Sequence, residues 1–277
     1  MAIHLREGVK VAGGKDIQEL GRRISLSRGT ALKSLGSAEG PPSIGDAVIP
    51  VGEWEFPALE DIEQLLSRSS EQPPCSTISL VSIPAPVLAS LDKLGVRLLQ
   101  SQREADLLEM QPTFKQALEP LVGHIKKYLL SDEGFLLLGL SVGESGLVTA
   151  TVDRGTGLRV GLHVDSWDRK RSLEDRRIAR NRMCINLGVE ARSFLFINLD
   201  LVHVRDLLLT QGESNLPSTS GMIKQFSACF PSYPVIRLVI APGEAYIAPT
   251  ECIIHDATTL AKQHPDINFT AIGFFKP

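Results

Sequence analysis

The chain has 277 residues, of which 43% are hydrophobic and 22% charged, and its formal net charge is −3 at pH 7. These values are typical of a globular protein, and the net charge argues against a function in which a basic surface binds nucleic acid. No apolar run approaches the ~20 residues that span a bilayer, and the first residues lack the pattern of a signal peptide. The four cysteines form no CxxC pair, which argues against a zinc site or a disulfide framework. We therefore expect a cytoplasmic protein with neither a nucleic-acid nor a membrane partner.

Helical periodicity dominates residues 1–134. Apolar residues recur at three- and four-residue spacing, which predicts amphipathic helices, in residues 16–23, 57–67, 84–110 and 112–130. Polar stretches rich in proline, glycine and serine separate them and predict loops at residues 36–43 and 67–76. The first half of the chain is therefore expected to be mainly helical.

From residue 135 the pattern becomes that of short strands. They are predicted at residues 135–142, 147–152, 158–165, 182–187, 194–199, 236–240, 244–254 and 267–275. Eight short strands suit a two-sheet jelly roll. Without a repeat or a clear linker, we expect one α+β domain over residues 1–277, with helices from residues 1–134 packed on one sheet of a core formed by residues 135–277.

His163, Asp165 and His255 form the candidate metal site. His163 and Asp165 lie two residues apart at the end of a predicted strand, so their side chains point to the same face. His255 lies on a later predicted strand, which follows the turn Pro242-Gly243 and is interrupted by Pro249. Two histidines and one carboxylate are the facial triad that binds Fe(II) and leaves the remaining coordination positions open. An isolated HxD pair arises often by chance, but the strands around both halves favour metal binding.

This combination resembles the double-stranded β-helix, or cupin-type jelly roll, of the Fe(II)/2-oxoglutarate-dependent oxygenases. The resemblance covers roughly residues 135–277; residues 1–130 resemble no family. It implies that His163, Asp165 and His255 bind Fe(II), and that 2-oxoglutarate and O₂ are cosubstrates.

Such a cosubstrate needs a cationic anchor, because a guanidinium binds a carboxylate through two parallel hydrogen bonds. Members of the family often carry this arginine after the distal histidine, but no arginine follows His255 here. The predicted strand 182–187 offers Arg182 instead. Strand alternation places Arg182, Cys184 and Asn186 on one face, which we expect to point inward, and three apolar residues on the other.

Two further residues are candidates for binding 2-oxoglutarate. Arg159 lies four residues before His163 and therefore on the same strand face. Thr258 follows His255 closely and is a candidate hydroxyl donor, although a threonine here also suits a turn.

Trp167 and Asp168 directly follow the metal pair, where a loop would edge the mouth of the barrel, and they are the candidate substrate contacts. An ordinary surface turn is the alternative. The arginine-rich stretch 169–180 alternates with acidic residues, which predicts a solvated loop or short helix and argues against an anion site.

The resemblance implies an enzyme that hydroxylates or desaturates a C–H bond. Because the mouth of a small barrel favours compact ligands, the expected substrate is a small polar metabolite, with a free amino acid as the first candidate. The alternative is a cupin-like metal-binding protein, or a metal enzyme that is not an oxygenase, which binds a small molecule.

Overall fold

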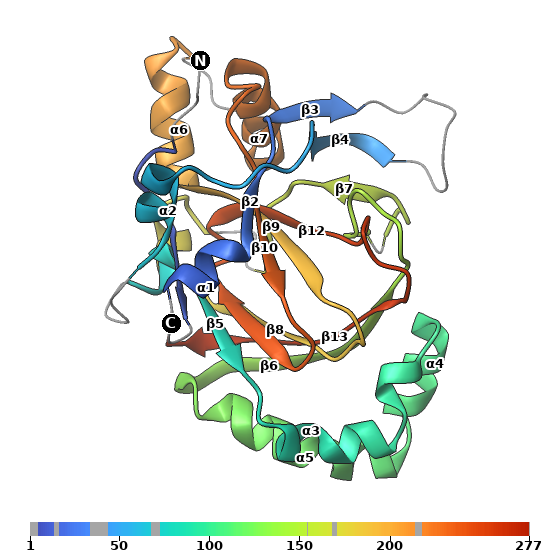
Figure 1. The fold of residues 1–277 in the computed structure, drawn as a ribbon. Coiled ribbons are helices and arrows are strands. Elements are labelled where there is room, and N and C mark those ends of the chain that lie inside the picture. The colour runs from blue at the N-terminus through green and yellow to red at the C-terminus, as the bar shows by residue number, and fades with distance from the viewer. Residues whose placement is uncertain are drawn as a thin grey trace.

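A computed structural model describes residues 5–13, 17–33, 44–67, 73–153, 155–167, 171–213 and 218–276, and its fold is mixed α+β (Figure 1). The α-helices within these residues are α1 (Ile17–Arg22), α2 (Leu59–Leu65), α3 (Ala85–Lys93), α4 (Gln102–Glu109), α5 (Pro112–Lys126), α6 (Leu201–Thr210) and α7 (Thr219–Cys229). The 3-10 helices are η1 (Pro74–Ser76), η2 (Val96–Leu98) and η3 (Asp175–Ile178).

The described strands form three sheets. The six-stranded sheet contains, in spatial order, β1 (Lys10–Gly13), β5 (Thr77–Ser82), β11 (Glu244–Ala248), β8 (Asn181–Asn186), β13 (Asp266–Phe275) and β6 (Leu129–Gly143). The four-stranded sheet contains β12 (Ile253–Thr258), β9 (Arg192–Asp200), β10 (Ile236–Ile240) and β2 (Ile24–Leu26). The three-stranded sheet contains β3 (Thr30–Lys33), β4 (Ile44–Pro50) and β7 (Arg159–Gly161).

Helices cover the outer face of the six-stranded sheet. In Figure 1, α3, α4 and α5 gather on this side of the molecule. Met183, Ile185 and Leu187 of the β8 region pack here in one hydrophobic cluster with side chains of α3 and α5. The expectation that these three residues point outward onto helices is therefore confirmed, and the alternate residues of β8 point to the interior.

The interior between the two larger sheets holds the second hydrophobic cluster. Cys184 and Tyr246 of the six-stranded sheet share this cluster with Phe194 and Phe196 of β9. Beyond the four-stranded sheet, α6 contacts β9, and α7 contacts β3 and β4.

The N-terminal half differs from the sequence prediction. Helices α1, α2 and α5 lie where helices were expected, but among the described residues five strands also lie wholly before residue 134 and β6 begins at Leu129, and the sequence predicted none of these strands here. β1 and β5 extend the six-stranded sheet, and β2 joins the four-stranded sheet. These strands have three to seven residues, too few to show a clear alternation against the helical pattern around them.

Two other predicted elements are each divided in the structure for a local reason. The predicted helix 84–110 is divided at Gly95, which has φ +74°, and the N-cap Ser101 then starts α4. The predicted strand 244–254 is divided at Pro249 into β11 and β12, which belong to different sheets. Residues 147–152 form no strand apart from one bridge at Val152.

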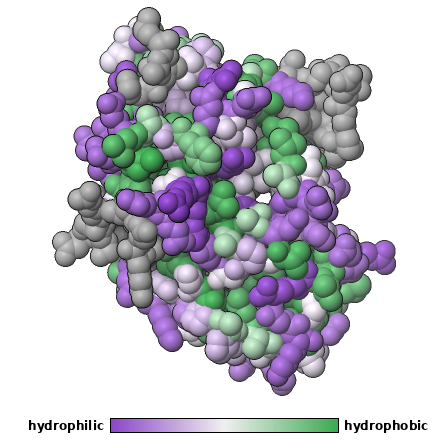
Figure 2. Space-filling model, in the orientation of Figure 1, coloured by the Kyte–Doolittle hydropathy of each residue, from purple (hydrophilic) through white to green (hydrophobic). Residues whose placement is uncertain are grey.

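No helix of the described residues is both long and apolar enough to cross a membrane. On the face drawn in Figure 2, hydrophilic and hydrophobic residues are interspersed.

Candidate metal centre

The two halves of the candidate site meet through direct backbone pairing. Just beyond β7, His163 forms an antiparallel bridge with His255 of β12. The two backbone hydrogen bonds between them measure 2.9 and 2.8 Å. Asp165 continues the contact, since its N–H donates to the carbonyl oxygen of Thr250 at 3.0 Å. Backbone pairing thus fixes the relative positions of two segments that are far apart in the sequence.

All three predicted ligands converge on one point. The Oδ1 of Asp165 lies 3.9 Å from His163 Nε2, and its Oδ2 lies 3.7 Å from His255 Nε2. The three potential ligand atoms all lie within 4.8 Å of one another. Such a cluster can offer three neighbouring positions to a single ion.

The hydrogen bonds of the imidazoles define which nitrogen is free. Nδ1 of His163 lies 2.8 Å from the carbonyl oxygen of Gly161, and Nδ1 of His255 lies 3.1 Å from that of Ile253. A carbonyl only accepts, so each Nδ1 carries a proton, and Nε2 is the nitrogen that each ring turns toward Asp165. This arrangement is the usual support of a metal-binding histidine.

One buried polar atom of the site, Nε2 of His255, lacks a hydrogen-bond partner, whereas Oδ2 of Asp165 lies 2.8 Å from Nη2 of Arg182. Unpaired buried polar atoms are costly and call for an explanation. A cation bound to His255 Nε2 and to Asp165 would satisfy the imidazole and share the carboxylate with Arg182, and the donor set of imidazole and carboxylate suits Fe(II). The residues therefore fit the metal that the sequence resemblance implies.

The protonation states of the site also favour a cation. Burial, reinforced by the neighbouring His163, lowers the pKa of His255 to about 3, so its imidazole is neutral at neutral pH. Burial acts to raise the pKa of Asp165, but Arg182 and the two histidines outweigh it and the pKa is lowered. Neutral imidazoles and an ionised carboxylate are the ligand forms that bind metals.

Arg182, the predicted cosubstrate anchor, lies beside the triad. Its Nη2 is 2.8 Å from Oδ2 of Asp165, and its guanidinium lies 5.7 Å from the ring centroid of Trp167. Burial acts to lower the pKa of Arg182, but Asp165 outweighs it and the pKa is raised. The inward orientation expected from strand parity is confirmed, whereas a role in binding 2-oxoglutarate stays a prediction.

A second interior arginine was missed by the sequence analysis. Arg192 opens β9, and its Nη1 lies 2.5 Å from Sγ of Cys184 while its guanidinium is 5.9 Å from the ring of Tyr246. Asp266 lies 3.3 Å away as its carboxylate partner. Strand alternation could have predicted its inward orientation, because Arg192 lies two residues before Phe194 on the same strand face, and Phe194 packs in the interior.

The remaining predicted site residues have varied surroundings. Arg159 donates to the carbonyl oxygen of Thr149 and to Glu144, and the hydroxyl of Thr258 donates to the carbonyl oxygen of Leu147. Both side chains are thus engaged away from the triad, and their role toward 2-oxoglutarate remains a prediction. Trp167 is 39% exposed beside Arg182, whereas Asp168 lies outside the described residues.

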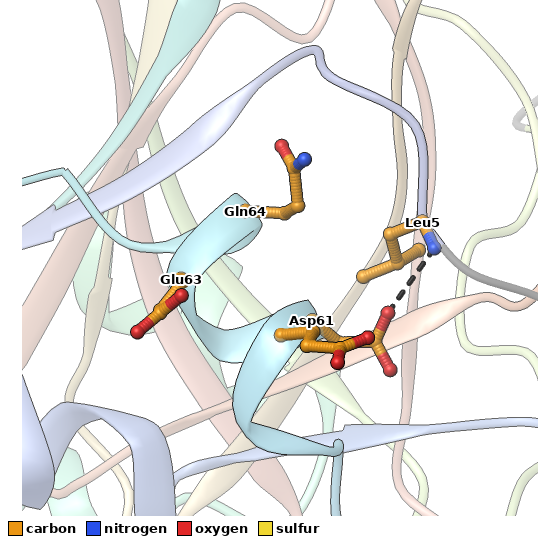
Figure 3. Close-up of a pocket in the computed structure, with 5 residues that line it drawn as sticks. Leu5, Asp61, Glu63 and Gln64 are labelled. Atoms are coloured by element: carbon orange, nitrogen blue, oxygen red, sulfur yellow. Dashed lines mark hydrogen bonds between the residues drawn. The ribbon is translucent and has the colours of Figure 1, made fainter.

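The described residues also line several cavities. One of about 500 Å³ is lined by Leu5 and by residues of α2, among them Asp61, whose Oδ1 accepts the Leu5 N–H at 3.1 Å (Figure 3). None of the three ligands lines it. Another, of about 350 Å³, is lined by Leu162, Val164 and α7 as well as His163. This groove therefore adjoins the ligand-bearing segment through His163, and neither Asp165 nor His255 lines it.

No family model matches the chain, and no curated protein matches its sequence significantly. Solved structures with some likeness include the Kdo hydroxylase KdoO, a non-heme Fe(II) α-ketoglutarate-dependent dioxygenase in complex with cobalt(II). It is 15% identical with a TM-score of 0.42, over 73% of this chain and 81% of that chain. Apo HygX from Streptomyces hygroscopicus is 12% identical with a TM-score of 0.29, over 70% and 82% of the two chains. Both likenesses are too weak to carry an argument about function, which must rest on the site itself.

Proposed function

We propose that this protein is a non-haem Fe(II)/2-oxoglutarate-dependent oxygenase that hydroxylates a small polar metabolite. The observation that carries the proposal is the convergence of His163, Asp165 and His255, in which the buried Nε2 of His255 has no hydrogen-bond partner. A triad of this composition leaves half of an octahedral coordination sphere open for a cosubstrate and O₂.

The connectivity of the strands supports a jelly-roll core around this site. Of the consecutive strands β8 to β13, β8, β11 and β13 lie in the six-stranded sheet, whereas β9, β10 and β12 lie in the four-stranded sheet. The chain therefore crosses repeatedly between the two sheets. β7 continues toward the four-stranded sheet, because the bridge between His163 and His255 joins its end to β12. Two facing sheets built by such alternation are the architecture of a double-stranded β-helix.

The charge of the interior supports an anionic cosubstrate. Three buried or largely buried cations, Arg182, Arg192 and Lys262, face two carboxylates, Asp165 and Asp266. A divalent ion bound to Asp165 would compete with Arg182 for this carboxylate and leave a positive charge beside the ion without its anionic partner. A dianion such as 2-oxoglutarate would compensate this charge, and Arg182 would be the first guanidinium released to bind it.

Each side chain then has a defined task. His163, Asp165 and His255 would hold the ion, and Arg182 would orient the distal carboxylate of 2-oxoglutarate. When bound, Fe(II) would couple oxidative decarboxylation of 2-oxoglutarate by O₂ to oxidation of a substrate C–H bond. Phe194, whose ring centroid lies 5.8 Å from that of His255, would help to exclude water, and the partly exposed Trp167 would contact the substrate.

Turnover tests this proposal directly. Succinate release from 2-oxoglutarate should require Fe(II), O₂ and a substrate, and a panel of free amino acids and related polar metabolites should include one that stimulates it. His163→Ala, Asp165→Ala and His255→Ala should each abolish this release. Metal binding without any conversion of 2-oxoglutarate would instead place the protein among metal-binding cupins or among other metal enzymes. Stimulation by peptides or large apolar compounds alone would refute the proposed substrate class.

A further inference from the structure

Arg176 of η3 is a buried arginine whose hydrogen bonds go to the backbone around the triad. The residue is 5% exposed, although its sequence context predicted a solvated stretch. Its Nη1 donates to the carbonyl oxygen of Asp165 at 2.9 Å and to that of Glu251 at 3.0 Å. Its Nη2 donates to the hydroxyl of Ser166 at 3.1 Å.

These hydrogen bonds join the two segments that carry the ligands. Asp165 and Ser166 belong to the segment that follows His163, whereas Glu251 lies in the turn immediately before β12, which carries His255. A single Nη1 thus bridges the carbonyl oxygen of one ligand residue and the turn that positions another. A planar guanidinium is suited to such a bridge, because its N–H bonds point in fixed directions.

The charge of Arg176 has no other evident task. Among the ion pairs between described residues, none involves Arg176, whereas the adjacent Arg177 pairs with Asp200 at 2.8 Å. A buried cation is costly unless its hydrogen bonds are satisfied, and here backbone carbonyls at the metal site supply two of them.

We infer that Arg176 is a positioning residue of the metal centre, which holds the HxD segment against the β11–β12 turn and thereby sets the affinity for the ion. The inference rests on the proposed metal-dependent function, but it concerns metal binding rather than turnover. Groups that orient metal ligands change metal affinity by about 10- to 100-fold when they are removed. An effect of this size is expected for Arg176.

Titration with Co(II), followed by its visible absorption and without any cosubstrate, tests the inference. Arg176→Met keeps the length of the side chain and removes all of its donors, so it should weaken Co(II) binding about 10- to 100-fold. Arg177→Met is the matched control, because it removes the neighbouring arginine of the same 3-10 helix without touching the ligand segments. It should leave Co(II) affinity unchanged.

A second variant separates positioning from loss of fold. Arg176→Lys retains the charge but not the planar fork, so it should recover only part of the affinity and alter the Co(II) spectrum. If Arg176→Met does not fold, Arg176→Lys decides the question. Equal Co(II) affinity in the wild type and in the folded Arg176 variants would overturn the inference while leaving the proposed function intact. Failure of the wild type to bind Co(II) or Fe(II) at all would overturn both.

Discussion

At the scale of single residues, His255 illustrates how burial prepares a ligand. Its side chain is 2% exposed, and its Nδ1 proton is bound by a carbonyl, which leaves Nε2 as a free lone pair. Burial, with His163, lowers the pKa of His255 to about 3, so protons compete weakly with a metal for Nε2 at neutral pH.

The same shift predicts a pH dependence of the stability of the metal-free protein. An unfolded histidine has a pKa of about 6.5, so as the pH falls from about 6.5 to about 3 the unfolded chain binds a proton that folded His255 rejects. The free energy of unfolding should therefore fall by about 2 kcal/mol between pH 7 and pH 5. Urea unfolding of the chelator-treated protein measures it. His255→Asn should flatten this slope, and an identical slope in the variant would mean that another group is responsible.

Arg182 should act on 2-oxoglutarate more than on the metal. Arg182→Ala removes a cation that competes with Fe(II) for Asp165, so metal affinity should be retained or increased. Loss of the charge-assisted contact to the distal carboxylate should raise the 2-oxoglutarate requirement by roughly 30-fold or more, the equivalent of ~2–5 kcal/mol. Calorimetric titration of 2-oxoglutarate into the metal-loaded protein measures this change.

Arg192→Met is the informative comparison for Arg182→Ala. If Arg192→Met loses 2-oxoglutarate binding while Arg182→Ala keeps it, the anchor lies on β9 and our assignment is wrong. If neither variant is affected, neither arginine is the anchor and Arg159 becomes the next candidate.

At the scale of elements, β7 shows how backbone conformation delivers a ligand. Gly161 ends this strand with φ +67°, and its carbonyl oxygen accepts the Nδ1 proton of His163. A Cβ at this position would meet the carbonyl oxygen of Val48 on β4 at 2.5 Å. The close approach of two strands, together with the left-handed backbone, explains why glycine precedes the HxD pair.

Gly161→Ala should therefore impair both folding and metal binding. The left-handed conformation costs about 1–2 kcal/mol for alanine, and the contact with Val48 adds to this cost and displaces His163. Gly157→Ala is the control, because Gly157 also has a positive φ of +70° but has nothing within 4 Å of its Cβ position. Thermal unfolding and Co(II) titration should both be worse for Gly161→Ala. Equal losses of thermal stability and Co(II) affinity in the two variants would show that the close contact between Gly161 and Val48 is not the cause.

The elements also define how much the sequence could predict. Strand alternation is a local property, so it correctly placed His163 with Asp165 and turned Arg182 inward. Arg192 and Arg176 escaped because burial of a charged residue depends on partners distant in sequence, Asp266 for one and the carbonyl oxygen of Glu251 for the other. The strands of the N-terminal half were missed because β1, β2 and β5 are stabilised by pairing with distant strands.

At the scale of the whole molecule, buried charges help to fix how the sheets meet. The carboxylate of Asp266 on β13 forms ion pairs with Lys262 Nζ at 3.0 Å and with Arg192 Nη2 of β9 at 3.3 Å. The pair with Arg192 links the two larger sheets. Burial acts to raise the pKa of Asp266, but Arg192 and Lys262 outweigh it and the pKa is lowered.

Asp266→Asn should destabilise the protein strongly at neutral pH. Removal of one partner leaves two buried cations without their carboxylate, which typically costs about 3–5 kcal/mol. Because the folded pKa of Asp266 is lowered, its contribution is present above the unfolded pKa of about 3.9 and is lost as the pH falls through the folded value. The difference in unfolding free energy between wild type and variant should therefore shrink below about pH 4.

The exposed pair of Asp132 with Lys126 provides the control for this prediction. Their charged atoms are 4.0 Å apart and the Asp132 side chain is 80% exposed, so Asp132→Asn should have little effect at any pH. A similar loss in both variants would show that burial is not the cause.

The central claim is that His163, Asp165 and His255 hold one Fe(II) with coordination positions left open for 2-oxoglutarate. Anaerobic titration of Fe(II) in the presence of 2-oxoglutarate tests it most directly, because the chelate produces a weak visible charge-transfer band. The wild type should develop this band to saturation at one Fe(II) per chain, and His255→Ala should not develop it. Absence of the band in wild-type protein that binds Fe(II), or its persistence in His255→Ala, would contradict the account.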